Sequence, residues 1–295
     1  MVAAVATQAC AGQPQGSDAL AAPPTTVPSL TVTPPPKPLP PPSDAAVQAF
    51  IRSHAAPSRI GQLARWGRPI CPKTAGVDPE KGAVIVQHIA QLAELVGAPV
   101  APPGCRPNLA VIVSDNPQSV LDYVRVHLPD LLGYHYISQE RRIATVRFPI
   151  QAWYVTATRG SNGDLIVDDS CCNAAGARAG SRLTSDISSE LVSVVVVIDA
   201  TLLARRDLGA IADDVAVLGL SQANPSHACG DIPSILDVGA PDCPEADKVV
   251  SATDGDVAFL KALYATDPRV IGSLQRSNIA DAMRRDALTR PSQAR

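Results

Sequence analysis

A run of apolar and mostly β-branched residues, LVSVVVVI, occupies residues 191–198 and ends at Asp199. Such a continuous run is typical of a strand that is buried on both faces of a sheet. Residues 108–114, NLAVIVS, predict a second strand. Residues 142–158 are rich in β-formers but contain Pro149, so they predict two strands or one bulged strand.

Apolar residues at helical spacing predict helices around these strands. In residues 80–96 they form one stripe that ends at Gly97, a helix-stop signal. His88 lies on this stripe without a second histidine one turn away, so we expect a half-buried packing residue and not a metal ligand. The Asn-Pro pair at 116–117 predicts the start of a helix that reaches about residue 132. Four further helices are expected: 44–53 capped by Ser43, 206–222, 253–264 with Thr253 as cap and Asp256 at its third position, and a charged helix over 277–295 that frays. A strand over 65–71 with its proline at an edge and a polar loop over 160–180 complete the expected elements.

The start of the chain has features of an export signal. Residues 1–10, MVAAVATQAC, resemble the end of a signal peptide whose charged first part is missing. The letters TQAC resemble a loose bacterial lipobox, which makes Cys10 the candidate for lipidation. Ordinary cleavage after Ala9 and an alanine-rich start without a targeting role are the competing interpretations.

A proline-rich segment separates this start from the rest of the chain. Residues 11–43 contain PPTTVP and PPPKPLPPP, which favour an extended polyproline spacer because proline fixes φ and removes a donor. We therefore expect one globular domain over residues 44–275, followed by a helical or frayed tail over 276–295.

Composition and charge exclude some classes of function. Hydrophobic residues make up 46% of the chain and aromatic residues only 3%, so we expect a core of Ala, Val, Leu and Ile. The net charge of -3 and the lack of a basic run with interleaved aromatics argue against a nucleic-acid partner. No apolar stretch approaches the ~20 residues that cross a bilayer. Membrane contact is therefore expected only through the N-terminal lipid anchor.

The seven cysteines include no C-x-x-C pair. Disulfides formed in an oxidising compartment explain such a number more simply than metal or redox chemistry in the cytosol. Cys71 with Cys105 and Cys229 with Cys243 are the candidate pairs, although sequence alone does not fix the connectivity. The adjacent cysteines at 171–172 fit neither pair.

The second half of the chain is organised around the stretch LGAIADDVAVLGLSQANPSHACGDIPSIL. As a helix it places Ala212 and Ala216 one turn apart, with Asp213 beside them. Gly219 ends the periodic run and Gln222 follows the turn. This spacing resembles the metzincin metallopeptidase motif H-E-x-x-H-x-x-G-x-x-H, in which three histidines bind zinc and the glutamate is the base. Because an alanine methyl has no lone pair, the resemblance implies a zincin-like domain that has lost its metal site.

The order of the following elements adds to this resemblance. Residues 231–236 resemble the metzincin Met-turn, with Leu236 in the place of the methionine. Residues 252–264 resemble the last helix of such domains. The resemblance covers about residues 190–265 and implies an α+β fold with a mixed sheet, a central motif helix and a C-terminal helical part.

The resemblance also implies a function. We expect an exported pseudo-metallopeptidase, periplasmic or lipid-anchored in the bacterial envelope, that needs no metal and no other cofactor. Its retained cleft would bind a peptide or an envelope protein, or act as a scaffold.

An active zinc peptidase is a second interpretation of the same residues. Asp213 would replace the glutamate base, although its side chain is one methylene shorter. Gln222 is a weak zinc ligand, so further ligands would have to come from elsewhere, for example from His227 and Cys229.

A serine hydrolase and a plain packing helix are the two other interpretations. The letters VAVLGLSQA resemble a nucleophile elbow with Ser221 as nucleophile. Only His227 lies downstream, without an acid between the two, which is the wrong order for that family. In the plainest interpretation the helix merely packs through Ile211, Val215 and Leu218 in a globular α/β domain.

Overall fold

The computed structural model describes residues 42–168, 185–244 and 249–289. The predicted leader with Cys10, nearly all of the proline-rich segment, and Cys171 and Cys172 lie outside these residues.

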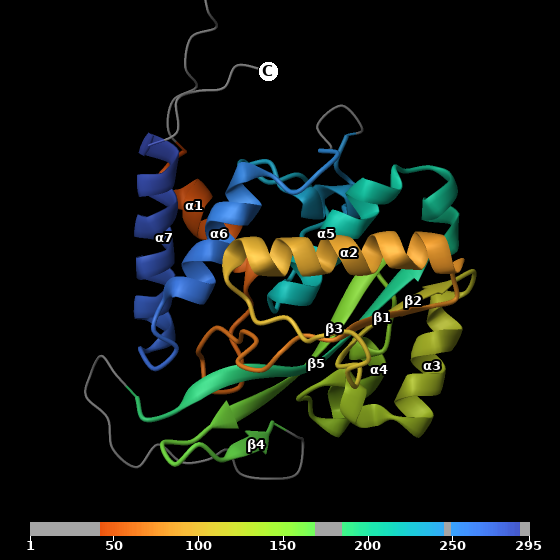
Figure 1. Cartoon of the computed structure of the whole chain (residues 1–295), viewed down its shortest axis with the longest axis horizontal. Coiled ribbons are helices and arrows are strands. Elements are labelled where there is room, and N and C mark those ends of the chain that lie inside the picture. Colours follow the sequence, from red (N-terminus) through yellow and green to blue (C-terminus); the bar gives the residue numbers. More distant parts are fainter. Residues whose placement is uncertain (1–41, 169–184, 245–248, 290–295) are drawn as a thin grey trace, which may run out of the picture. The chain divides into compact units, whose positions relative to one another are not determined.

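A mixed five-stranded sheet forms the centre of the described fold (Figure 1). The strand order is β1-β2-β5-β3-β4. β1, β2 and β5 are parallel, whereas β3 is antiparallel to β5, and β4 is antiparallel to β3. The expected α+β class with a mixed sheet is therefore confirmed. The strands are β1 (Pro72–Ala75), β2 (Leu109–Ser114), β3 (Ile150–Arg159), β4 (Leu165–Val167) and β5 (Ser188–Asp199).

The central strand β5 is covered on both faces, as its β-branched run predicts. Val194 and Val196 belong to the larger of two hydrophobic clusters, whereas Val195 and Val197 belong to the smaller one. This alternation follows from the two-residue period of a strand. Asp199 ends the strand and its side chain accepts from the N–H of Thr201.

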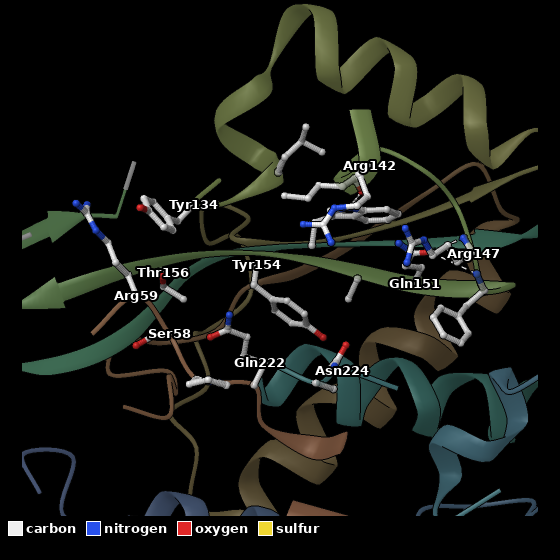
Figure 2. Close-up of a pocket in the computed structure, with 18 of the residues that line it drawn as sticks. Ser58, Arg59, Tyr134, Arg142, Arg147, Gln151, Tyr154, Thr156, Gln222 and Asn224 are labelled. Carbon is white, nitrogen blue, oxygen red and sulfur yellow. Dashed lines mark hydrogen bonds between the residues drawn. The ribbon is translucent and has the colours of Figure 1, made fainter. Parts of the chain in front are cut away.

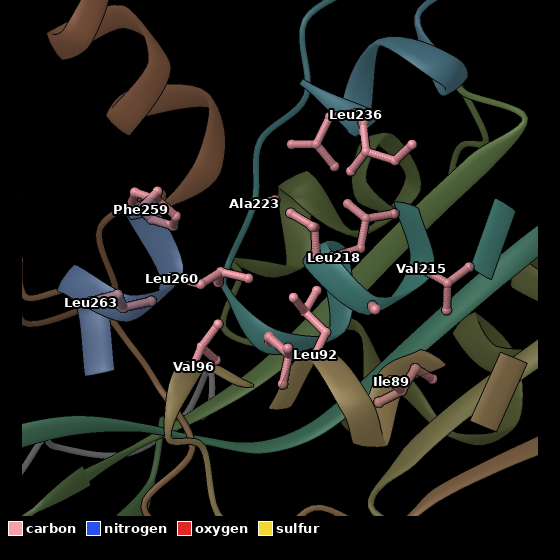
Figure 3. Packing of buried hydrophobic residues seen from close by; sticks show 14 of the residues in the cluster. Ile89, Leu92, Val96, Val215, Leu218, Ala223, Leu236, Phe259, Leu260 and Leu263 are labelled. Atoms are coloured by element: carbon pink, nitrogen blue, oxygen red, sulfur yellow. The ribbon is translucent and has the colours of Figure 1, made fainter. Parts of the chain in front are cut away.

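Two helices cover the face of the larger cluster, α2 (Pro79–Val96) and α5 (Leu208–Leu220). Gly97 ends α2 in the left-handed conformation at φ 81°, as expected from the sequence. Figure 3 shows the contact between the two helices, with Leu92 of α2 beside Leu218 of α5. The predicted helix over 206–222 is therefore confirmed with shorter ends, and it runs one residue past Gly219.

The opposite face of the sheet is covered by α3 (Pro117–His127), the 3₁₀ turns Pro129–Leu132 and Ile137–Gln139, and the short α4 (Glu140–Ile143). The expectation of one helix to residue 132 is wrong, because Pro129 lacks the N–H that a continuing helix needs. The expectation of strand from residue 142 is wrong as well: α4 occupies 140–143, and β3 begins only after Pro149. The remainder forms one continuous strand: the register shift between Val155 and Thr156 skips Val192 of β5, so the extra residue lies in β5 and the bulge predicted for this segment is not in β3.

Three further helices pack at one end of the sheet: α1 (Asp44–His54), α6 (Asp254–Ala265) and α7 (Gly272–Thr289). Ser43 caps α1, and Thr253 with Asp256 forms the predicted capping box of α6. The charged C-terminal helix begins five residues earlier than expected, and Ile279 and Met283 bury their side chains in the core.

Two other expectations fail because tertiary contacts use the residues differently. Residues 65–71 form only isolated bridges and no strand. Arg65 instead donates to the carbonyls of Leu263 and Thr266 at the end of α6, and burial lowers the pKa of its guanidinium to about 10. The expected loop over 160–180 contains β4, and its part from residue 169 on lies outside the described residues.

Both candidate disulfides are present. Cys71 is joined to Cys105 and Cys229 to Cys243. Such bonds are typical of proteins from oxidising compartments. Among the described residues no helix is both long and apolar enough to span a bilayer.

Candidate functional site

A cavity of about 570 Å³ lies along β3, on the side away from β5, and we call it the β3 groove (Figure 2). Its size falls in the ordinary range for ligand pockets. The described residues that line it come from the segment 56–59, from Leu132 and Tyr134, from residues 142–148, from β3 between Gln151 and Thr156, and from the segment 222–224 after α5.

The groove follows the part of β3 that has no strand beside it. β4 pairs only with the last three residues of β3, Ala157 to Arg159. The preceding residues, 150–156, pair with β5 on one side and have no partner strand in the described part of the chain on the other. An unpaired stretch of strand is a template for another extended segment.

The direction of the β3 backbone groups follows from the alternation of an antiparallel ladder. Thr156 accepts a hydrogen bond from the N–H of Asp168, on the side away from β5. The backbone groups of Ala152 and Tyr154 therefore also point away from β5. Gly133 covers the carbonyl of Tyr154, since a Cβ at Gly133 would lie 2.0 Å from it. No described residue hydrogen-bonds the N–H groups of Ala152 and Tyr154 or the Ala152 carbonyl.

Three side chains that line the groove have buried polar atoms without a hydrogen-bond partner. They are the hydroxyl of Ser58, the hydroxyl of Tyr154 and the Oε1 of Gln222. Figure 2 shows Tyr154 extending from β3 with its hydroxyl end beside Asn224, and Gln222 rising from the facing wall on the other side of the ring. Buried polar atoms are nearly always satisfied in folded proteins, so three exceptions in one cavity need an explanation.

A buried carboxyl lies behind this wall. Asp214 of α5 is 2% exposed, and its Oδ2 has no hydrogen-bond partner among the described residues. Burial raises the pKa of Asp214 well above its usual range, and Asp256 and Asp237 add to the effect. Burial also raises the pKa of Tyr154; the backbone N–H of Ala223 beside the hydroxyl acts against this rise, and the charge of Asp214 adds a smaller rise. Tyr154 is therefore uncharged at neutral pH, and burial favours the protonated form of Asp214.

The charged side chains of the groove are all basic. Arg59, Arg142 and Arg147 line it, and no aspartate or glutamate does so among the described residues. Arg59 lies over the ring of Tyr134 at 4.7 Å from its centroid. The charged side chains that line the groove are therefore three arginines, although the chain as a whole is acidic.

The structure brings only one of the predicted motif positions to this groove. Gln222 lines it, whereas Ala212 and Ala216 are fully buried and line no described cavity. Gly219 lies against the sheet, since a Cβ there would come 2.7 Å from Leu109. The small residues along α5 thus let it pack closely against its neighbours.

The remaining motif residues have structural contacts. Asp213 points to α2, where its Oδ1 lies 2.6 Å from Nδ1 of His88, and its Oδ2 accepts from the N–H of Ala252. His88 is half-buried, as expected. Leu236 packs in the core above α5, in the 3₁₀ turn η4 (Ile235–Gly239) (Figure 3).

The residues of the two enzyme interpretations are not assembled into a site. Ser221 is fully buried, and its hydroxyl donates to the carbonyl of Val217, with no histidine bonded to it. Cys229 is in a disulfide, and His227 stacks near Phe148. No group of three or more potential metal ligands occurs within the described residues.

A second polar cluster, which the sequence did not reveal, joins α1, η4 and α6. The Nε2 of His54 lies 2.9 Å from Oδ1 of Asp256 and 3.0 Å from the hydroxyl of Ser234. The Ser234 hydroxyl also donates to Asp256 at 2.7 Å. The other ring nitrogen of His54 bonds the carbonyl of Phe50. We call these three side chains the His54 cluster.

The His54 cluster contains a serine, a histidine and an aspartate but not the arrangement of a catalytic triad. In a triad the serine and the aspartate bond different ring nitrogens of the histidine, whereas here both bond Nε2. All three side chains are also at least 96% buried, with exposures of 1%, 4% and 0%. The cluster therefore ties three elements together, and its arrangement is not that of a triad.

Apart from Gln222, the residues that line the groove were not singled out in the sequence. Tyr154, Ser58 and Arg147 carry no local motif, and Arg142 was assigned to a strand. Comparison with protein-family models, with curated proteins and with solved structures gives no match to the chain.

Proposed function

We propose that this protein is a catalytically inactive, zincin-like binding domain of the bacterial envelope, and that it binds an extended polypeptide segment along β3. The segment would add to the sheet as a further strand, beside Ala152 and Tyr154. The observation that carries the proposal is the coincidence of unpaired β3 backbone groups with unpartnered buried side-chain atoms in one cavity.

The order of elements supports the zincin-like part of the proposal. The buried strand β5 leads into α5, the turn η4 follows, and the capped helix α6 comes next. The turn packs on α5 through Leu236, which agrees with the role expected of a residue in the Met-turn position. Fold and activity are separable, so a groove that meets the motif helix only at Gln222 supports a binding role.

The polar atoms in the groove suit a peptide ligand. A peptide offers one N–H donor and one C=O acceptor per residue, which are the groups that the β3 edge lacks. The Oε1 of Gln222 is an acceptor, while the hydroxyls of Ser58 and Tyr154 both donate and accept. These atoms are buried in the wall of the groove, so each gains a partner only when its side chain turns toward an extended chain in the groove.

The experiment removes the backbone N–H of Ala152, which points into the groove, without altering the fold. Ala152→Pro removes one donor that no other strand uses, and proline is tolerated on an edge. Peptides selected from a random phage library on the native protein serve as the probe, with binding measured by fluorescence polarisation. We expect affinity to fall by roughly tenfold or more, since each lost bond costs about 1.4 kcal/mol.

Ala152→Ser is the matched control, because it keeps the N–H and the small side chain; its affinity should stay within about twofold. Circular dichroism and thermal unfolding verify that the proline variant folds. Undiminished peptide binding by Ala152→Pro, or failure to select any peptide, refutes strand addition. Stoichiometric zinc that is lost on chelation together with peptide cleavage refutes the inactive part of the proposal.

A further inference from the structure

The arginines of the β3 groove indicate the chemistry of the segment that it binds. This inference rests on the proposed function. We infer that the bound segment carries acidic side chains, and that these pair with Arg142 and Arg147. Three observations lead to it: the lack of internal partners for the two guanidinium groups, the rigidity of the segment that carries them, and the distribution of charge along the groove.

Arg142 and Arg147 have no carboxylate partner in the described part of the chain. Both are exposed, and no ion pair or side-chain hydrogen bond involves either of them there. Other arginines on this side of the molecule are paired, for example Arg125 with Glu140 and Arg159 with Glu190. Two adjacent guanidinium groups without a counter-charge raise the local concentration of anionic ligands.

The chain around these arginines is held in place by side-chain hydrogen bonds. Gln118 of α3 donates to the carbonyl of Ala144 and accepts from the N–H of Val146. The Oε1 of Gln151 accepts from the N–H of Arg147. A fixed backbone reduces the ordering cost of binding, so this end of the groove is organised in advance for a ligand.

The charge is not spread evenly along the groove. Figure 2 shows Arg142 and Arg147 near Gln151 at one end, while Tyr154, Gln222 and Asn224 form an uncharged middle. Arg59 and Tyr134 lie at the other end. The uncharged middle suits the backbone of the segment, and the pair of arginines suits one or two carboxylates, which guanidinium groups bind through two hydrogen bonds each.

The experiment compares residue preferences in peptides selected by the native protein and by variants. The native protein should select peptides enriched in aspartate and glutamate. In a peptide with its acidic residues changed to glutamine, affinity should fall by about tenfold. The double variant Arg142→Gln, Arg147→Gln should bind the acidic and the glutamine peptide within about twofold of each other. Its acidic-peptide affinity should also depend less on salt between about 50 and 500 mM.

The matched control is Arg141→Gln with Arg106→Gln. Both residues are exposed, neither lines the groove, and Arg141 lies on the same short helix as Arg142. The control has the same net charge as the test variant and should keep the acidic preference. Peptide binding without acidic preference, or an equal loss in the control, refutes the inference while the proposed function stands. Failure to select any peptide refutes the proposed function itself.

Discussion

The His54 cluster and the wall of the β3 groove both bury a carboxyl, with opposite outcomes. Asp256 accepts from His54, Ser234 and the N–H of Ile235, so both of its oxygens are satisfied. Asp214 is as deeply buried, but one of its oxygens has no partner among the described residues. Burial acts to raise the pKa of both carboxyls. In Asp256 the hydrogen bonds from His54 and from backbone N–H groups outweigh the effect of burial, so its pKa is lowered, whereas the pKa of Asp214 stays raised.

The difference shows that burial alone does not decide the role of a polar group. A fully bonded cluster joins elements and contributes to stability. A buried group without partners is costly, and a protein retains it where function needs it. Each prediction below changes one side of this comparison.

The largest effect is expected at Asp256. Asp256→Ala removes the acceptor that His54, Ser234 and Ile235 share, and it leaves their donors buried without a partner. We expect the free energy of unfolding to fall by about 3 kcal/mol or more, measured by urea denaturation. Asp254→Ala is the control, because Asp254 lies in the same helical turn but is exposed; its cost should be about 1 kcal/mol or less. Equal costs in the two variants would show that the cluster does not join these elements.

Much of the fold is predictable because its signals are local. The capping box of Thr253 and Asp256, the stop at Gly97 and the apolar run of β5 each lie within a few residues of the structure that they specify. Residues 65–71 were misassigned because Arg65 and Trp66 bond carbonyls of α6 and α5 that are distant in the sequence. No local pattern reveals such a contact.

The groove was beyond prediction for the same reason. Tyr154 lies in a predicted strand, but its hydroxyl is placed beside Ala223 and Asp214 only by the packing of α5 on the sheet. The motif spacing identified α5 as the organising helix, and it led to Gln222 in the groove. It did not show that Asp213 turns to His88 on α2.

The next effect concerns pH. The pKa of Asp214 is raised in the folded state, so protonation of Asp214 stabilises the folded protein relative to the unfolded chain. This contribution to the free energy of unfolding is fully present below the unfolded pKa of about 3.9. It is lost as the pH rises from there toward the folded pKa. Asp214→Asn removes this loss, so stability should decline less with rising pH, by up to about 1.4 kcal/mol per pH unit. Chemical denaturation at a series of pH values measures it, with the native protein as reference.

Asp256→Asn should change the acidic side of the curve of unfolding free energy against pH. The lowered pKa of Asp256 gives stability that is present above the unfolded pKa and is lost as the pH falls through the folded pKa. The asparagine variant should therefore lose less stability in acid than the native protein does. Parallel pH curves for Asp214→Asn and the native protein would contradict a raised pKa for Asp214.

The smallest expected effect is a difference in the stability cost of removing the hydroxyl from two buried tyrosines, Tyr264 and Tyr154. The hydroxyl of Tyr264 donates to the carbonyl of Leu220 at 2.8 Å, whereas the Tyr154 hydroxyl has no hydrogen-bond partner among the described residues. Tyr264→Phe leaves a carbonyl unpaired and should cost about 1 to 2 kcal/mol in thermal or urea unfolding. Tyr154→Phe removes a hydroxyl that lies beside the Ala223 backbone but makes no well-placed hydrogen bond, so its effect on stability should stay within about 0.5 kcal/mol.

Peptide affinity should show the reverse order for these two variants. Tyr154→Phe should weaken the binding of selected peptides by up to about tenfold, because the buried hydroxyl gains a partner when the side chain turns toward a bound peptide. Tyr264 does not line the groove, so its phenylalanine variant should bind as the native protein does. A loss of stability in Tyr154→Phe as large as that in Tyr264→Phe would mean that the hydroxyl serves the fold, and the contrast between bonded and unbonded polar groups would then not identify the binding site.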